Sequence, residues 1–251
     1  MLKLYALGVH GWMPHDGLLT SCLAIETDKE VIVLDCGSGF SRIFDYPELL
    51  KKTLKIFLSH SHLDHTNGLF YLYALPELED IQVSLYCDPQ TLIEIAPLLN
   101  IPLSVPFLQM AQKIDFRFED INELSRTFLV PLKHSVRCLG IGFEVNGKEI
   151  AYCTDTGLCD NLYELIQGAD VAILECTWTD PTFEDEGHLN PRTAAQVAKD
   201  AGVGRLLLTH FTGTRPGGPF ATRASILEAE SVARQIFHNT TALLDGMVLD
   251  I

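Results

Sequence analysis

The stretch HSHLDHTNG, residues 60–68, places three of the nine histidines of this 251-residue chain beside an aspartate. Imidazole nitrogens and carboxylate oxygens are ligands that suit zinc, iron or manganese. On an extended segment His60 and His62 project to the same side, because side chains two residues apart share a face. They can therefore share one ion, while Asp64 and His65 follow after a turn and can reach a second one. The spacing predicts a metal site for divalent cations.

Three further candidate ligands follow expected strands. The sequence predicts strands at residues 128–132, 149–152 and 205–209, and the candidates His134, Asp155 and His210 come just after them. Loops at strand ends are where sites are usually built. A carboxylate at Asp155 could bridge two cations and hold them about 3.5–4 Å apart, the separation found in two-metal hydrolases.

The rest of the chain alternates strands and helices. Further strands are expected at 31–34, 55–58, 82–86, 140–144, 171–174 and 241–249, and helices at 89–99, 190–200 and 225–237. Asn146-Gly147 is a strong signal for a hairpin turn. The two successive strand-and-helix halves predict an α/β fold, a four-layer αββα sandwich formed by a single domain over residues 1–251.

Composition limits the compartment and the partners. Eighteen basic against 33 acidic residues give a net charge of −15, and 47% of the chain is hydrophobic. Such a negative surface repels phosphate backbones, so we expect a small anionic substrate and judge nucleic-acid binding unlikely. Seven cysteines without a CxxC pair, no signal-peptide pattern and no long apolar run indicate a cytoplasmic protein that does not enter a membrane. A homodimer is left open.

The ordered motifs resemble those of the metallo-β-lactamase superfamily. They are HSHLDHTNG (60–68), the isolated His134, CTDTG (153–157), LLTHF (207–211) and the early element LDCG (34–37). The resemblance implies that His60, His62 and His134 bind one metal ion, that Asp64, His65 and His210 bind the other, and that Asp155 bridges them. It implies two divalent ions per chain, zinc first, with manganese or iron as alternatives. Histidine at position 62, where the flavodiiron branch has glutamate, argues against a redox iron site.

A second element resembles the ribonuclease Z group and its small phosphodiesterase relatives. It consists of Glu175 in LECTW and of His188 in GHLN. The resemblance implies catalytic roles for Asp64, His188 and Glu175, with His188 serving the leaving oxygen and Glu175 orienting it. An imidazole suits this task because it titrates near neutral pH. Arg215, in the loop after His210, is a candidate to bind a substrate phosphate.

These features predict a two-metal phosphodiesterase in which a hydroxide that bridges the metals attacks phosphorus. Ribonuclease Z has a long basic arm between the isolated histidine and the bridging aspartate, whereas only 20 residues separate His134 from Asp155 here. The expected substrate is therefore a small or cyclic phosphodiester rather than transfer RNA. The alternative is a lactone, ester or thioester hydrolase that uses the same metal ligands. Such an enzyme does not need the element formed by Glu175 and His188. A binding protein that merely keeps the metals is a third interpretation.

Overall fold

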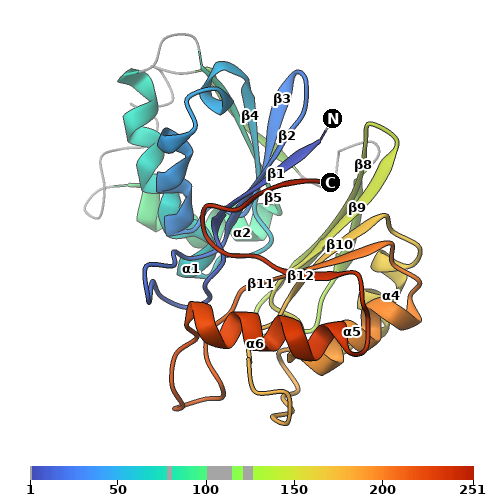
Figure 1. The fold of residues 1–251 in the computed structure, drawn as a ribbon. Helices are drawn as coiled ribbons and strands as arrows, with labels where there is room; N and C mark the ends of the chain where they lie inside the picture. Colours follow the sequence, from blue (N-terminus) through green and yellow to red (C-terminus); the bar gives the residue numbers. More distant parts are fainter. Residues whose placement is uncertain (1, 78–80, 101–114, 121–126) are drawn as a thin grey trace. The chain divides into compact units, whose positions relative to one another are not determined.

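The computed structural model describes residues 2–77, 81–100, 115–120 and 127–251, which form two compact units (Figure 1). The first unit comprises Met1–Gly8, Leu19–Leu124 and Asp245–Ile251, and the second comprises Val9–Leu18 and Ser125–Leu244. Among the described residues, no helix combines the length and the hydrophobicity that a membrane crossing requires. That both units belong to one domain stays a prediction.

The first unit contains a seven-stranded sheet in the order β13-β1-β2-β3-β4-β5-β6. Its strands are β1 (Lys3–Gly8), β2 (Cys22–Glu26), β3 (Glu30–Leu34), β4 (Thr53–Phe57), β5 (Gln82–Cys87), β6 (Asp115–Asp120) and β13 (Val248–Asp250). The strands β3 to β6 run parallel, and β13 to β3 pair antiparallel. Because β3 and β4 are parallel neighbours, the loops that follow them leave the same edge of the sheet.

Short helices accompany this sheet. They are η1 (Ser38–Asp45), η2 (Leu49–Lys51), α1 (Leu63–Thr66), η3 (Asn67–Glu77), α2 (Pro89–Ile95) and η4 (Ala96–Leu99), and η1 packs on β1 and β2. The helix α2 begins where the side chain of Asp88 accepts a hydrogen bond from the Gln90 backbone amide, as an N-cap residue does. The core of this unit is formed by buried apolar side chains, among them Phe40, Leu54 and Leu72, which fixes η1 and η3 against the strands.

The second unit contains a six-stranded sheet in the order β12-β11-β10-β9-β8-β7. Its strands are β7 (Thr127–Pro131), β8 (Leu139–Val145), β9 (Lys148–Cys153), β10 (Val171–Glu175), β11 (Arg205–Thr209) and β12 (Thr240–Ala242). The hairpin β8–β9 turns at Asn146 and Gly147, both with positive φ, as the sequence predicts. The strands β9 to β12 are parallel, so their carboxyl ends meet at one edge.

Three helices complete the second unit (Figure 1): α4 (Asp160–Ile166), α5 (Pro191–Asp200) and α6 (Arg223–Arg234). The first packs on β7, β8 and β9, the second on β10 and β11, and the third on β12 and α5. Asn190 caps α5 and Pro191 opens it, as expected from the sequence. The expected helix at 225–237 begins earlier, at Arg223, because the side chain of Thr222 caps it.

The C-terminal expectation was wrong in one respect. The single strand expected at 241–249 is two strands, β12 and β13, which belong to different sheets. The break lies at Asp245 and Gly246, where Gly246 has a φ of +85° and the Asp245 carboxylate accepts a hydrogen bond from the Leu19 amide. The strands β1, β2 and β6 and the helix α4 were not foreseen.

Candidate metal centre and active site

Three candidate site residues share an unusual backbone conformation. Asp35, Asp155 and His210 follow β3, β9 and β11, and each has a positive φ, of 57°, 50° and 59°. Non-glycine residues rarely adopt this left-handed conformation, and those that do gather at functional sites, where the surrounding structure enforces it. Of the six described non-glycine residues with positive φ, these three lie just after the carboxyl ends of strands, as does Asn146 of the hairpin turn.

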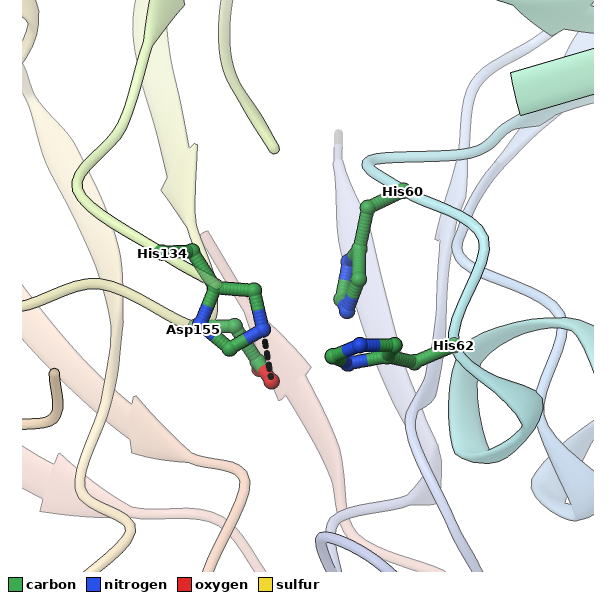
Figure 2. Close-up of side chains that lie close together, drawn as sticks. All are labelled: His60, His62, His134 and Asp155. Atoms are coloured by element: carbon green, nitrogen blue, oxygen red, sulfur yellow. Dashed lines mark ion pairs between the residues drawn. The ribbon is translucent and has the colours of Figure 1, made fainter. Parts of the chain in front are cut away.

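In the first unit, the loop after β4 brings three histidines together. The ring centroids of His60 and His62 lie 4.6 Å apart, and those of His60 and His65 lie 4.2 Å apart. Figure 2 shows the side chains of His60 and His62 leaving this loop. The His65 Nε2 lies 3.5 Å from Oδ2 of Asp64. The structure therefore places the four candidate ligands of this unit beside one another.

A buried aspartate fixes the orientation of these rings. Asp35 accepts hydrogen bonds from the Ser59 amide (2.7 Å), from the Ser59 hydroxyl (2.8 Å to Oδ2) and from His65 Nδ1 (2.7 Å). Since the Ser59 hydroxyl donates its only proton to Asp35, it accepts from His60 Nδ1 at 2.9 Å. Both imidazoles are thus bound through Nδ1, so Nε2 is the nitrogen with which each would bind a metal ion. Metal-ligating histidines are supported in this way, so the donor set fits a divalent cation.

Replacing Asp35 with alanine should affect both stability and metal binding. The variant leaves buried donors of Ser59 and His65 unsatisfied, so we expect the free energy of unfolding to fall by about 3–5 kcal/mol. We expect the affinity of the protein for zinc to fall by about 10–100-fold. Urea denaturation and zinc titration measure the two effects. Asp28→Ala, which removes an exposed carboxylate of the same unit, should change neither, and an unaltered Asp35→Ala would refute this role.

In the second unit, the Asp155 carboxylate faces two histidines. Its Oδ1 lies 3.0 Å from Nε2 of His210, and its Oδ2 lies 3.7 Å from Nε2 of His134, the pair marked in Figure 2. The Gly157 amide donates to the Lys133 carbonyl, which holds the loop of His134 beside the turn of Asp155. Each oxygen of the carboxylate therefore lies near a different imidazole. This arrangement is compatible with a carboxylate that bridges two cations.

Behind these residues lies a second buried carboxylate. The two oxygens of Glu175 accept hydrogen bonds from the Thr156 amide (2.7 Å), His188 Nδ1 (2.9 Å), the Thr177 amide (3.0 Å) and the Leu189 amide (3.3 Å). The Thr177 hydroxyl lies 3.0 Å from His210 Nδ1 and 3.2 Å from His188 Nδ1. Glu175 thus connects the turn that presents Asp155 to the loop of His188, and Thr177 orients His210 through Nδ1.

His188 lies against the candidate ligands of its unit. Its ring centroid is 5.4 Å from that of His134 and 6.4 Å from that of His210, the latter ring being nearly parallel. Burial on its own lowers the pKa of His188, but the charge and the hydrogen bond of Glu175 raise it more, so the pKa lies above its ordinary value. The hydrogen bond between Nδ1 and Glu175 holds the imidazole in a fixed position.

Arg215 is placed differently. It is exposed and lines a cavity of about 290 Å³ together with Trp12, Trp178 and Phe220. Its charge reaches the Asp180 carboxylate, whose pKa is lowered first by hydrogen bonds from Thr182 and then by Arg215. Its contact with a phosphate stays a prediction.

Sequence reasoning missed two supporting roles. The sequence analysis includes Asp35 only within the motif LDCG (34–37) and Thr177 only within LECTW, and it predicts no contact of either residue with a histidine. The signal for Asp35 was its polar side chain directly after a buried apolar strand; for Thr177 no local signal exists, because its partner His210 is 33 residues away.

Residues 31–211 match the family model described as "Beta-lactamase superfamily domain". The chain belongs to this superfamily, whose metallo-β-lactamase fold confirms the expected α/β class and the expected enzyme class, a metal-dependent hydrolase. The metallo-β-lactamase fold protein YhfI from Bacillus subtilis superposes with a TM-score of 0.76 at 21% identity, covering 100% of both chains. A diphosphatase from the PhnP family gives a TM-score of 0.73 at 19% identity, covering 100% of this chain and 98% of its own.

Ribonuclease Z of Azobacteroides pseudotrichonymphae is 26% identical to this chain over 98% of it and 97% of the relative. This similarity confirms the expected branch. It also corrects the expectation that nucleic-acid binding is unlikely, because a relative matching nearly the whole chain is named for its action on RNA. The physical error was to read a net charge of −15 as a property of every surface: the local field at a site is set by the groups and cations there, which the chain total does not describe.

Proposed function

We propose that this protein hydrolyses phosphoric diesters at a centre of two divalent metal ions. In this proposal His60, His62 and His134 bind one ion, Asp64, His65 and His210 bind the other, and Asp155 bridges them. The superfamily membership supports the assignment, as do the contacts of Ser59, Asp35 and Thr177 with Nδ1 of His60, His65 and His210, which orient the three imidazoles. When bound, such ions supply Lewis acidity and a nucleophile from water at neutral pH.

The single observation behind the choice of phosphorus is the pair of Glu175 and His188. Glu175 is fully buried, and its Oε1 lies 2.9 Å from His188 Nδ1, so the imidazole is held with a carboxylate behind it. His188 then donates a proton to the leaving oxygen, and Glu175 positions the ring and stabilises its charged form. Lactone and thioester hydrolysis on the same ligands has no comparable use for this pair.

For the substrate we infer a small or cyclic diester. Between His134 and Asp155 the chain has the hairpin β8–β9, closed by the tight turn at Asn146 and Gly147. The resemblance to ribonuclease Z assigns a long basic arm to this interval, and a hairpin of this size offers no such arm. Transfer RNA is the second candidate, and the ribonuclease Z relatives favour it. Rates on a cyclic nucleotide, on bis(4-nitrophenyl) phosphate and on a precursor transfer RNA decide between them.

Metal removal tests the proposal as a whole. Dialysis against a chelator should lower the rate on bis(4-nitrophenyl) phosphate by at least about 10³-fold, because the ions supply several kcal/mol of transition-state stabilisation. Adding back zinc or manganese should restore the rate up to two equivalents. Elemental analysis measures the remaining metal. A protein that keeps its activity with less than about 0.1 equivalent of metal would contradict the proposal.

We also infer a cytoplasmic location. All seven cysteines are free thiols, and six of them are buried. Reduced buried cysteines are usual in compartments kept reducing. Fractionation of the native cell, with thiol labelling of the protein, tests this location.

A further inference from the structure

A cavity of about 290 Å³ in the second unit is lined mainly by aromatic side chains and a glycine-rich loop. Three aromatic side chains, Trp12, Trp178 and Phe220, line it together with the loop of residues 212–218, which includes Arg215. The volume is at the lower end of the range for small-molecule sites, about 300–1,000 Å³, so it suits one small planar group. Trp12 and Trp178 are the only tryptophans of the chain.

Trp12 combines an exposed side chain with a left-handed backbone conformation. Its side chain is 69% exposed, and its φ of +64° is rare for a bulky residue. The neighbouring backbone fixes this conformation: the Gly11 amide donates to the Phe211 carbonyl at 2.8 Å, and the Phe211 amide donates to the Val9 carbonyl at 2.9 Å. An exposed indole held by strained backbone is a feature that function, more than packing, explains.

A second exposed ring extends this surface. The centroid of Phe220, which is 36% exposed, lies 6.0 Å from that of Trp12, with the two planes tilted by 53°. Arg215 reaches the same cavity and neighbours the Asp180 carboxylate. Because Asp180 offsets part of the charge of Arg215, the aromatic faces are the stronger recognition element.

The cavity borders the residues proposed to act in the reaction. A Cβ atom added to Gly11 would approach Cε1 of His210 to 2.7 Å, so the residue before Trp12 lies against that imidazole. Trp178 packs edge-on to His188, with centroids 6.0 Å apart, and its indole nitrogen donates to Asp185 at 2.8 Å. The wall of the cavity at Trp12 and Trp178 therefore adjoins His188 and His210.

We propose that this cavity binds a nucleobase of the substrate by stacking, so that the phosphoric diester is a nucleotide derivative. The inference rests on the proposed phosphodiester hydrolysis. Exposed aromatic rings with an arginine beside them are how proteins bind unpaired bases. A protein partner fits less well, since a specific interface needs about 1,000 Å² or more and a cavity of this size accommodates one ring.

The kinetic test compares two esters with the same leaving group, thymidine 5′-(4-nitrophenyl phosphate) and methyl 4-nitrophenyl phosphate. The wild type should prefer the nucleoside ester in kcat/KM. Trp12→Ala should reduce this preference by roughly 5- to 150-fold, the usual value of one base stacked on an aromatic ring, and Trp12→Phe should retain most of it. The control Phe128→Ala removes a comparably exposed ring (65%) on β7, outside the cavity, and should keep the preference.

Tryptophan fluorescence gives a readout that does not depend on turnover. Thymidine 5′-phosphate should quench the emission of the wild type, ribose 5-phosphate should not, and Trp12→Phe should lose most of the effect. If neither ester is hydrolysed but the nucleotide quenches selectively, the proposed reaction fails while the base site stands. Equal quenching by both phosphates, or an unchanged ester preference in Trp12→Ala, overturns the base site.

Discussion

Asp155→Ala should abolish metal binding and activity together. One carboxylate oxygen lies 3.0 Å from Nε2 of His210 and the other 3.7 Å from Nε2 of His134. In the proposed centre Asp155 bridges the metals, so one substitution removes a ligand from both ions. We expect the metal content to fall from two equivalents to below one and turnover to fall by about 10³-fold or more. Elemental analysis and rates on bis(4-nitrophenyl) phosphate, measured on the same sample, check both effects.

A matched control separates this effect from a general loss of charge. Asp160→Ala removes an exposed carboxylate at the start of α4, in the same unit, and should leave metal content and rate near those of the wild type. Circular dichroism should show both variants folded. If Asp155→Ala keeps two equivalents with unchanged affinity, Asp155 does not bridge the metals.

His188→Ala should leave the metals in place and slow the reaction according to the leaving group. The His188 ring contacts the candidate ligands but is bound through Nδ1 to Glu175, and in the proposed reaction it donates a proton rather than binding a metal. For an alkoxide leaving group, as in a cyclic nucleotide or dinucleotide, turnover should fall by about 10²–10⁴-fold. For a nitrophenolate, which departs without protonation, the loss should stay within about tenfold.

The comparison of the two leaving groups distinguishes proton donation by His188 from a positioning role. Equal losses for both would make His188 a positioning residue, and unimpaired rates on every phosphodiester would favour the lactone or thioester alternative. His238→Ala, which removes an exposed histidine of the same unit, is the matched control and should behave as the wild type. Metal content measured beside each rate excludes trivial loss of the ions.

The sequence alone predicted most strands and the candidate ligands, because both have local signals. A run such as that of β3 is buried at four of its five residues, and apolar runs of this kind indicate strands wherever they occur. His60, His62 and Asp64 stand out through residue type and spacing. The hairpin at Asn146 and Gly147 could also be predicted from the sequence, because Asn-Gly is a strongly preferred pair in type I′ hairpin turns.

What the sequence did not give depends on contacts between distant residues. Asp35 supports His65 from 30 positions away, and Thr177 orients His210 from 33 positions away, and no periodicity reports such pairs. The break between β12 and β13 depends on a hydrogen bond from Leu19 to Asp245. Trp12 follows His10 and Gly11, whose backbone pairs with that of Phe211, and no local pattern in the sequence indicates this pairing.

Anomalous diffraction at the absorption edge of the bound metal, from crystals of protein purified without chelator, tests the binuclear centre most directly. We expect two peaks per chain, separated by about 3.5–4 Å. One should be ligated by His60, His62 and His134 and the other by Asp64, His65 and His210, with Asp155 between them. Crystals grown from metal-replete protein that give no peak, or a peak at other side chains, would contradict it.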